Sequence, residues 1–173
     1  MATLINYTTQ QLIKPISENN AGRFEQIMVE TEIKDLQPLL GVSLYQDLIQ
    51  NSAEPKYVTL IEGTTWTLNG KPYIMKGLKY VIAYLFYANY VEQVAIADTF
   101  SGFVQHTFAE SQHVEAVEKR RIASMNREIA ARYFEEVRMY MNHANVTYSE
   151  YIGDGEKVFS PKIQRLDMID TGK

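Results

Sequence analysis

The segment of residues 80–97 constrains the fold most strongly, because it is apolar around nearly the whole helix that it would form. Glu92 is its only full charge. With Asn89 and Gln93, Glu92 leaves an uninterrupted apolar run too short to cross about 30 Å of hydrocarbon. A helix that is apolar on most sides must be surrounded by other elements. We therefore expect residues 75–98 to form the central helix of a bundle.

A second long helix is expected at residues 114–143, where apolar side chains recur at helical spacing. They form one stripe: Ile122, Met125, Ile129, Tyr133, Val137 and Tyr140 or Met141. A stripe of this kind needs an apolar partner, which residues 75–98 would supply. We predict that the two helices pack antiparallel and form the core pair.

Shorter helices are expected before this pair. Residues 20–36 carry apolar side chains at helical spacing until Pro38, which is expected to end the helix. A second short helix follows Gly41, and a third is indicated at residues 54–62. The predicted fold class is mainly α, a small helical bundle built on two long helices.

Residues 64–74 break this pattern, because β-forming residues flank Asn69-Gly70, the strongest short-range hairpin signal. After the second long helix the helical signals end, and Pro161 bars a regular helix through the last segment. We therefore expect one β-hairpin and an extended C-terminal arm. The domains are predicted as residues 1–152, an α-helical domain that includes the hairpin, and the arm at 153–173.

The charge balance argues against nucleic acid as the main ligand. Lys and Arg number 17 against 21 Asp and Glu, giving a net charge of −4, whereas proteins that hold phosphate backbones are usually basic. The second long helix does carry six basic residues, but six acidic residues lie on it or just before it. Mixed charges favour a solvated or ion-paired face, with nucleic-acid binding as the alternative. The basic residues are Lys119, Arg120, Arg121, Arg127, Arg132 and Arg138.

No catalytic, cofactor or metal site is predicted. The chain has no Cys, and its three His residues are not set at ligand spacing. Glu110 and His113 form one Glu-x-x-His pair, but a di-iron bundle needs a second pair and two further Glu residues. The Gly-Asp-Gly-Glu-Lys run that begins at Gly153 lacks the spacing of a phosphate-binding loop. We therefore expect a protein that is not an enzyme.

The order of elements resembles a known family. Residues 39–48 read Leu-Leu-Gly-Val-Ser-Leu-Tyr-Gln-Asp-Leu, and a long apolar helix, a Gly102-Phe103-Val104 loop leading to Ser111 and a long Tyr-containing helix follow. This arrangement is similar to the head-tail connector (adaptor) proteins of tailed bacteriophages, above all the neck ring proteins of crAss-like phages. The resemblance covers about residues 20–150.

The resemblance implies a structural protein of the virion. Such proteins form a homo-oligomeric ring, typically twelvefold, that lies below the portal, joins capsid to tail and continues the DNA channel. The implied partners are further copies of the chain, the portal protein, other neck or tail proteins, and double-stranded DNA that passes non-specifically during ejection. The implied location is the virion neck after synthesis in the host cytoplasm, without a membrane.

Two apolar segments are the expected contacts in such a ring. Phe100, Phe103 and Phe108 are too apolar for a free surface loop, although they could instead fold back on their own core. The arm carries six apolar residues that are too sparse to form a core of their own: Val158, Phe159, Ile163, Leu166, Met168 and Ile169. We expect a neighbouring subunit or the portal to cover these side chains.

Overall fold

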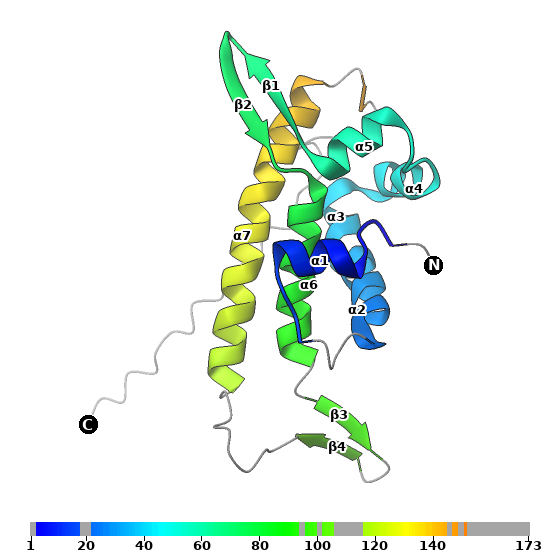
Figure 1. Ribbon diagram of the computed structural model, residues 1–173, viewed down its shortest axis with the longest axis vertical. Helices are drawn as coiled ribbons and strands as arrows, with labels where there is room; N and C mark the ends of the chain where they lie inside the picture. The colour runs from blue at the N-terminus through cyan, green and yellow to red at the C-terminus, as the bar shows by residue number, and fades with distance from the viewer. Residues whose placement is uncertain are drawn as a thin grey trace, which may run out of the picture.

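The computed structural model describes residues 3–17, 22–93, 96–99, 102–105, 116–144, 147–148 and 151, with 96–99 and 102–105 described by their backbone alone. Two long helices, α6 (Leu78–Gln93) and α7 (Ala116–His143), lie side by side and run antiparallel along the molecule (Figure 1). The predicted core pair and the mainly α fold class are confirmed.

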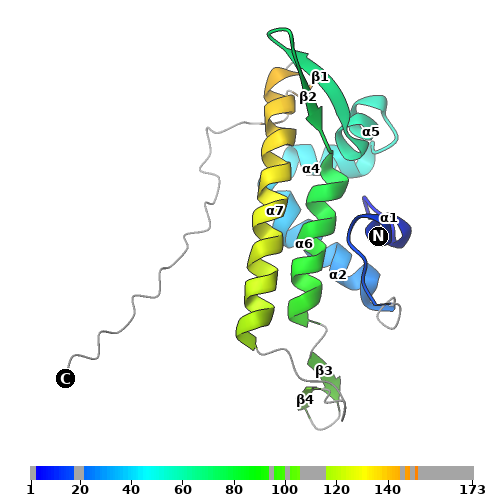
Figure 2. The ribbon, with the colours of Figure 1, turned by 60° about the vertical axis from the view of Figure 1, so that its left-hand side comes forward.

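Shorter helices cover the side of α6 that α7 leaves free (Figure 2). They are α1 (Tyr7–Ile13), α2 (Phe24–Thr31), α3 (Gln37–Leu40), α4 (Val42–Gln50) and α5 (Pro55–Glu62). Because α6 is enclosed in this way, apolar side chains on most of its circumference are buried, from Leu78 to Tyr90. The helix α1 was not predicted from the sequence.

The helix predicted at residues 20–36 continues past its expected end. Between α2 and α3 the chain forms a short π-helix, η2 (Glu32–Leu36). Pro38 does not end the helix as predicted, because it lies in the first turn of α3, where a missing N–H costs little. Gly41, with a φ of 80°, ends the helix instead.

The predicted hairpin is confirmed. Strand β1 (Thr64–Leu68) pairs antiparallel with β2 (Lys71–Met75) around Asn69 and Gly70, whose φ values of 52° and 76° fit a type I′ turn. The Trp66 ring stacks on Tyr73 at 5.2 Å between centroids and lies 4.7 Å from the His143 ring, which attaches one hairpin face to the end of α7. A second antiparallel pair, β3 (Ile96–Thr99) and β4 (Gly102–Gln105), follows α6.

Two glycines meet where the hairpin leaves the bundle. Gly63 and Gly77 have φ values of 94° and 86°, a region that L side chains rarely adopt. A Cβ atom on Gly77 would lie 2.3 Å from the carbonyl oxygen of Ile61 and 2.5 Å from the nitrogen of Gly63. The chain segments entering and leaving the hairpin can therefore approach this closely only because both positions lack a side chain.

The stripe predicted on α7 is confirmed at Val137 and Met141, and its other members miss the buried positions by one residue along the helix. The large residues Ile122, Ile129 and Tyr133 are only partly buried, and Met125 is 47% exposed. Small side chains allow α6 and α7 to approach closely, so they occupy the centre of the contact while larger neighbours lie on its flank. The residues that α7 buries are Ala123, Asn126, Ala130, Phe134, Val137 and Met141.

This difference gives a direct test of the core. Leu85 on α6 is 7% exposed, whereas Ile129 on α7 is partly exposed. Leu85→Ala should lower the free energy of unfolding by about 2–5 kcal/mol, and Ile129→Ala by about half as much or less. Urea denaturation of both variants measures the two losses. Equal losses would contradict the assigned α6–α7 contact.

Candidate subunit interface

Most of the predicted contact residues lie outside the described residues. This holds for Phe100, Phe108 and the six apolar residues of the arm. Phe103 lies in β4, where the structure describes only the backbone. The interface prediction for these nine side chains therefore stays a prediction, and the candidate interface consists of the surfaces that the structure does describe.

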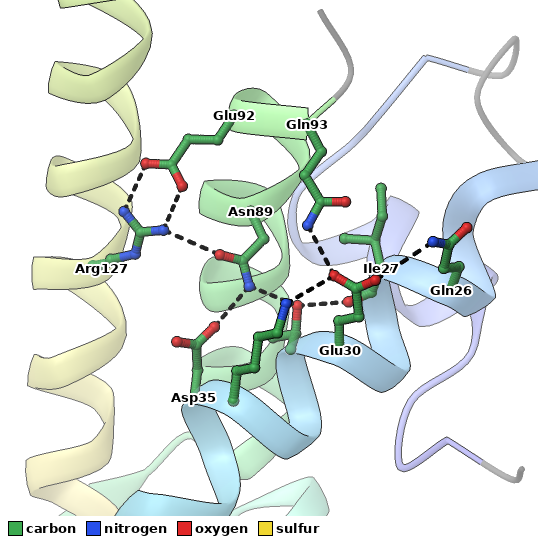
Figure 3. Close-up of polar contacts among 10 residues, drawn as sticks. Gln26, Ile27, Glu30, Asp35, Asn89, Glu92, Gln93 and Arg127 are labelled. Carbon is green, nitrogen blue, oxygen red and sulfur yellow. Dashed lines mark hydrogen bonds and ion pairs between the residues drawn. The ribbon is translucent and has the colours of Figure 1, made fainter. Parts of the chain in front are cut away.

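A polar network holds three helical elements in one arrangement (Figure 3). Asn89, on the otherwise apolar α6, donates from Nδ2 to Thr31 Oγ1 at 2.9 Å and to Asp35 Oδ2 at 2.6 Å. Arg127 of α7 donates to Asn89 Oδ1 at 3.1 Å. One buried amide thus links α7 to α2 and η2 through α6.

The same arginine also binds the last turn of α6. Arg127 donates two hydrogen bonds to Glu92, at 2.9 and 2.7 Å, in the bidentate geometry of a guanidinium and a carboxylate. These hydrogen bonds hold the pKa of Glu92 below its ordinary value. Buried polar networks of this kind fix one relative rotation of the helices that they join. An Asn within an apolar helix is the sequence signal that could have indicated the network.

The Asn89 linkage can be tested by mutation. Asn89→Ala should lower the free energy of unfolding by about 2–4 kcal/mol, because it leaves Thr31, Asp35 and Arg127 without their shared partner. Gln93→Ala is the control, since within the described residues Gln93 makes one hydrogen bond, of 3.2 Å, to Glu30 at the edge of the network. A thermal melt that fell equally in both variants would contradict a central role for Asn89.

A buried carboxyl attaches the N-terminal segment to the bundle. Glu32 lies in η2, is 2% exposed and accepts a hydrogen bond of 2.7 Å from the Leu4 backbone nitrogen. The Tyr45 hydroxyl of α4 also donates to this carboxyl. Burial raises the pKa of Glu32 to about 7, because loss of solvent disfavours the charged form. No cation pairs with Glu32 in the part of the chain that the structure describes.

Half of the basic residues of α7 are paired with glutamates. Arg121 lies 2.6 Å from Glu118, and Arg138 lies 2.7 Å from Glu135, in addition to the Arg127 pair. Within the described ranges no such pair involves Lys119, Arg120 or Arg132. The arrangement agrees with the ion-paired interpretation of this helix for three of its six cations.

Exposed apolar side chains lie on several elements, among them Leu12, Ile33, Val42 and Val58, and two further surfaces are candidate contacts. One is the α7 outer face, defined here as Val117, Met125 and Met139, which share the side of α7 opposite its buried stripe. The other is the hairpin outer face, opposite Trp66, where Ile74 is 65% exposed beside Thr65. Single exposed apolar residues are ordinary, whereas apolar side chains that share one face are typical of contact surfaces.

No motif for chemistry emerges from the described residues. No three His, Asp or Glu side chains among them come together as metal ligands would. None of the described helices combines the length and the hydrophobicity that a bilayer span requires.

Comparison with known proteins places the chain in a family. The family model DUF6712, described as a family of unknown function, matches residues 36–158, which is more than half of the chain. The chain belongs to this family. No curated protein and no solved structure matches it.

The DUF6712 match covers the two long helices and the hairpin over their full length. It begins at the last residue of η2 and includes the hairpin, α6, α7 and the described residues up to Tyr151. Asn89, Glu92 and Arg127 lie inside it, whereas Glu32 and Leu4 lie before it. The helix pair, the Asn89–Arg127–Glu92 part of the polar network and the hairpin thus belong to the family-matched part of the chain, whereas Thr31 and Asp35 lie before it.

Proposed function

We propose that this protein is a head-tail connector subunit of a tailed bacteriophage, a structural protein located in the virion neck. Copies of the chain would form a ring below the portal, join the capsid to the tail and continue the DNA channel. The resemblance at residues 39–48 and 102–104 supports this role. The role needs no catalytic group, cofactor or metal ion.

One structural observation carries the proposal. The subunit exposes apolar side chains on two unlike surfaces, the α7 outer face and the hairpin outer face. Each contact in a cyclic ring of more than two subunits joins one surface of a subunit to a different surface of its neighbour. A chain with two unlike contact surfaces on one rigid helix pair meets this requirement.

The charges are also compatible with a channel that DNA crosses without being held. The net charge is −4, and Arg121, Arg127 and Arg138 of α7 are engaged by glutamates. Phosphate contacts through free Lys and Arg side chains would raise the affinity for DNA and slow its passage. A ring of such subunits would therefore bind duplex DNA weakly.

The proposal can be tested on the purified full chain. We expect native mass spectrometry and electron microscopy to show a closed ring of defined mass, twelvefold if the family resemblance extends to symmetry. Deleting residues 156–173 should leave a folded subunit and abolish ring formation, since six apolar contact residues are lost. Lys162→Ala with Arg165→Ala is the control, because it shortens two charged side chains and keeps the apolar ones.

Two outcomes would contradict the connector proposal. One is a full chain that stays monomeric at every concentration tested. The other is a truncated chain that assembles as well as the intact protein.

A second candidate is a nucleic-acid-binding or packaging-associated helical protein. Lys119, Arg120 and Arg132 favour it, because no ion pair engages them among the described residues. This function predicts binding of duplex DNA by the isolated subunit, with affinity that falls steeply as salt increases. Loss of binding in the triple alanine variant would support it over the connector role.

A further inference from the structure

The register of the hairpin determines which backbone groups face outward. A two-residue turn closes on Leu68 and Lys71, so these residues form a hydrogen-bonded rung. Hydrogen-bonded and non-hydrogen-bonded rungs alternate along an antiparallel pair. Thr67–Pro72 and Thr65–Ile74 are therefore non-hydrogen-bonded rungs, whose N–H and C=O groups point away from the partner strand.

The two outer edges of the hairpin are not alike. Pro72 removes one outward N–H from β2, and the exposed Lys71 and Lys76 flank that edge. Proline and lysine are the residues that commonly prevent strand pairing at a free edge. On β1 the N–H groups of Thr65 and Thr67 remain, and no residue of this strand is charged. The β2 edge is thus protected against a further strand and the β1 edge is not.

The β1 edge is also accessible. Thr65 and Thr67 are exposed, and β2 is the strand nearer to α7, so the outer edge of β1 lies on the other side of the hairpin (Figure 2). The described residues provide one hydrogen bond to the outward groups of β1, from the Thr64 hydroxyl to the Thr65 carbonyl at 3.4 Å. A two-stranded ribbon is marginally stable, and a third strand on this edge would add backbone hydrogen bonds.

We propose that the outer edge of β1 is a strand-addition site for the C-terminal arm, residues 156–170, of a neighbouring copy of the chain. This inference rests on the proposed ring and identifies one of its contacts. An extended chain adds to such an edge through its backbone, while its alternate side chains bind the surfaces beside the strand. Val158, Phe159 and Ile163 supply residue types that favour strands.

The length of the chain beyond the described part suits this occupant. Tyr148 packs on Tyr140, and Tyr140 packs on Trp66, each at 6.0 Å between ring centroids, so the chain leaves the described part close to the hairpin. Tyr151 is followed by 22 residues, which reach at most about 75 Å when fully extended. That reach is longer than α7, whose 28 residues span about 42 Å. A chain that carries both the arm and the β1 edge supplies both halves of a head-to-tail contact.

The test compares a proline on the β1 edge with two control variants of the full chain. Thr65→Pro removes an outward N–H from the β1 edge, whereas Lys71→Ala changes a side chain of β2 and removes no N–H. Thr65→Val keeps the N–H and replaces the hydroxyl group by a methyl group. We expect Thr65→Pro to weaken assembly by about tenfold or more, while the other two variants assemble like the unchanged protein. Mass photometry measures assembly, and Trp66 fluorescence checks that the hairpin is retained.

Hydrogen exchange locates the contact. The Thr65 and Thr67 amides should exchange slowly in the assembled full chain and fast after deletion of residues 156–173. If Thr65→Pro assembles normally, or if Lys71→Ala weakens assembly equally, the β1 site is overturned while the ring proposal stands. If the full chain is monomeric with slow exchange at both threonines, the arm binds its own strand, which overturns the neighbouring copy as occupant. A monomer with fast exchange overturns both proposals.

Discussion

Gly77→Ala should destabilise the protein by at least about 3 kcal/mol. The positive φ of 86° is the first reason, because an L side chain is strained in that region. The second is that the added Cβ would lie within 2.5 Å of two backbone atoms, the Ile61 oxygen and the Gly63 nitrogen. Neither atom can move without displacing the start of the hairpin or the end of α5. Urea unfolding followed by circular dichroism measures the loss.

Gly70→Ala is the matched control for this prediction. Gly70 has a similar φ of 76°, but no atom lies within 4 Å of the position where its Cβ would be. The control therefore contains the backbone strain without the steric overlap, and it should cost only about 1 kcal/mol. If both variants lost the same stability, the close approach of the two chain segments at the base of the hairpin would be refuted.

The sequence predicts those elements whose signals are local. Asn69-Gly70 between β-forming residues is sufficient for the hairpin, because the turn itself requires positive φ at two positions. The apolar circumference of α6 likewise predicts a central helix, since only enclosure by other elements can keep such a helix from water. Both predictions depend on physics within one segment, and both are confirmed.

The sequence fails where the outcome depends on contacts between segments. Large apolar side chains suggested a stripe through Ile129, but the closest packing of α6 against α7 uses Ala123 and Ala130. Pro38 was expected to end a helix, yet the preceding π-helix changes the register so that the proline falls in a first turn. The partner helix α6, and not the apolar stripe on α7 itself, determines which side of α7 is buried.

The candidate interface was even less predictable. The sequence directed attention to apolar residues near position 100 and in the arm, whereas the described surfaces add the α7 outer face and the open edge of β1. The difference between the two edges follows from the rungs that Thr65, Thr67 and Pro72 occupy in the ladder, which are defined only once the register is known. A motif search cannot find a site made of backbone groups.

The free energy of unfolding should fall as pH rises from 4.5 to above 7, because the buried Glu32 carboxyl loses its proton in this range. Its folded-state pKa is about 7, against an ordinary value of 4.5 that applies to the unfolded chain. A raised folded-state pKa means that the protonated carboxyl favours the folded state, and this contribution is fully present below pH 4.5. It declines as pH rises from 4.5 and is lost once pH passes 7. The expected loss is about 3 kcal/mol.

Glu32→Gln tests this directly, because glutamine keeps an oxygen that can accept from the Leu4 nitrogen but cannot ionise. At about pH 8 the variant should be more stable than the unchanged protein by about 2–3 kcal/mol, and near pH 4.5 the two should be equal. Glu25→Gln, at an exposed carboxyl on α2, is the control and should show no such difference.

Carboxylates paired with cations, such as Glu92 beside Arg127, make the stability rise with pH, and they do so equally in every variant. The difference between Glu32→Gln and the unchanged protein therefore isolates the buried carboxyl, and a difference that stayed constant with pH would show that folding does not raise the pKa of Glu32.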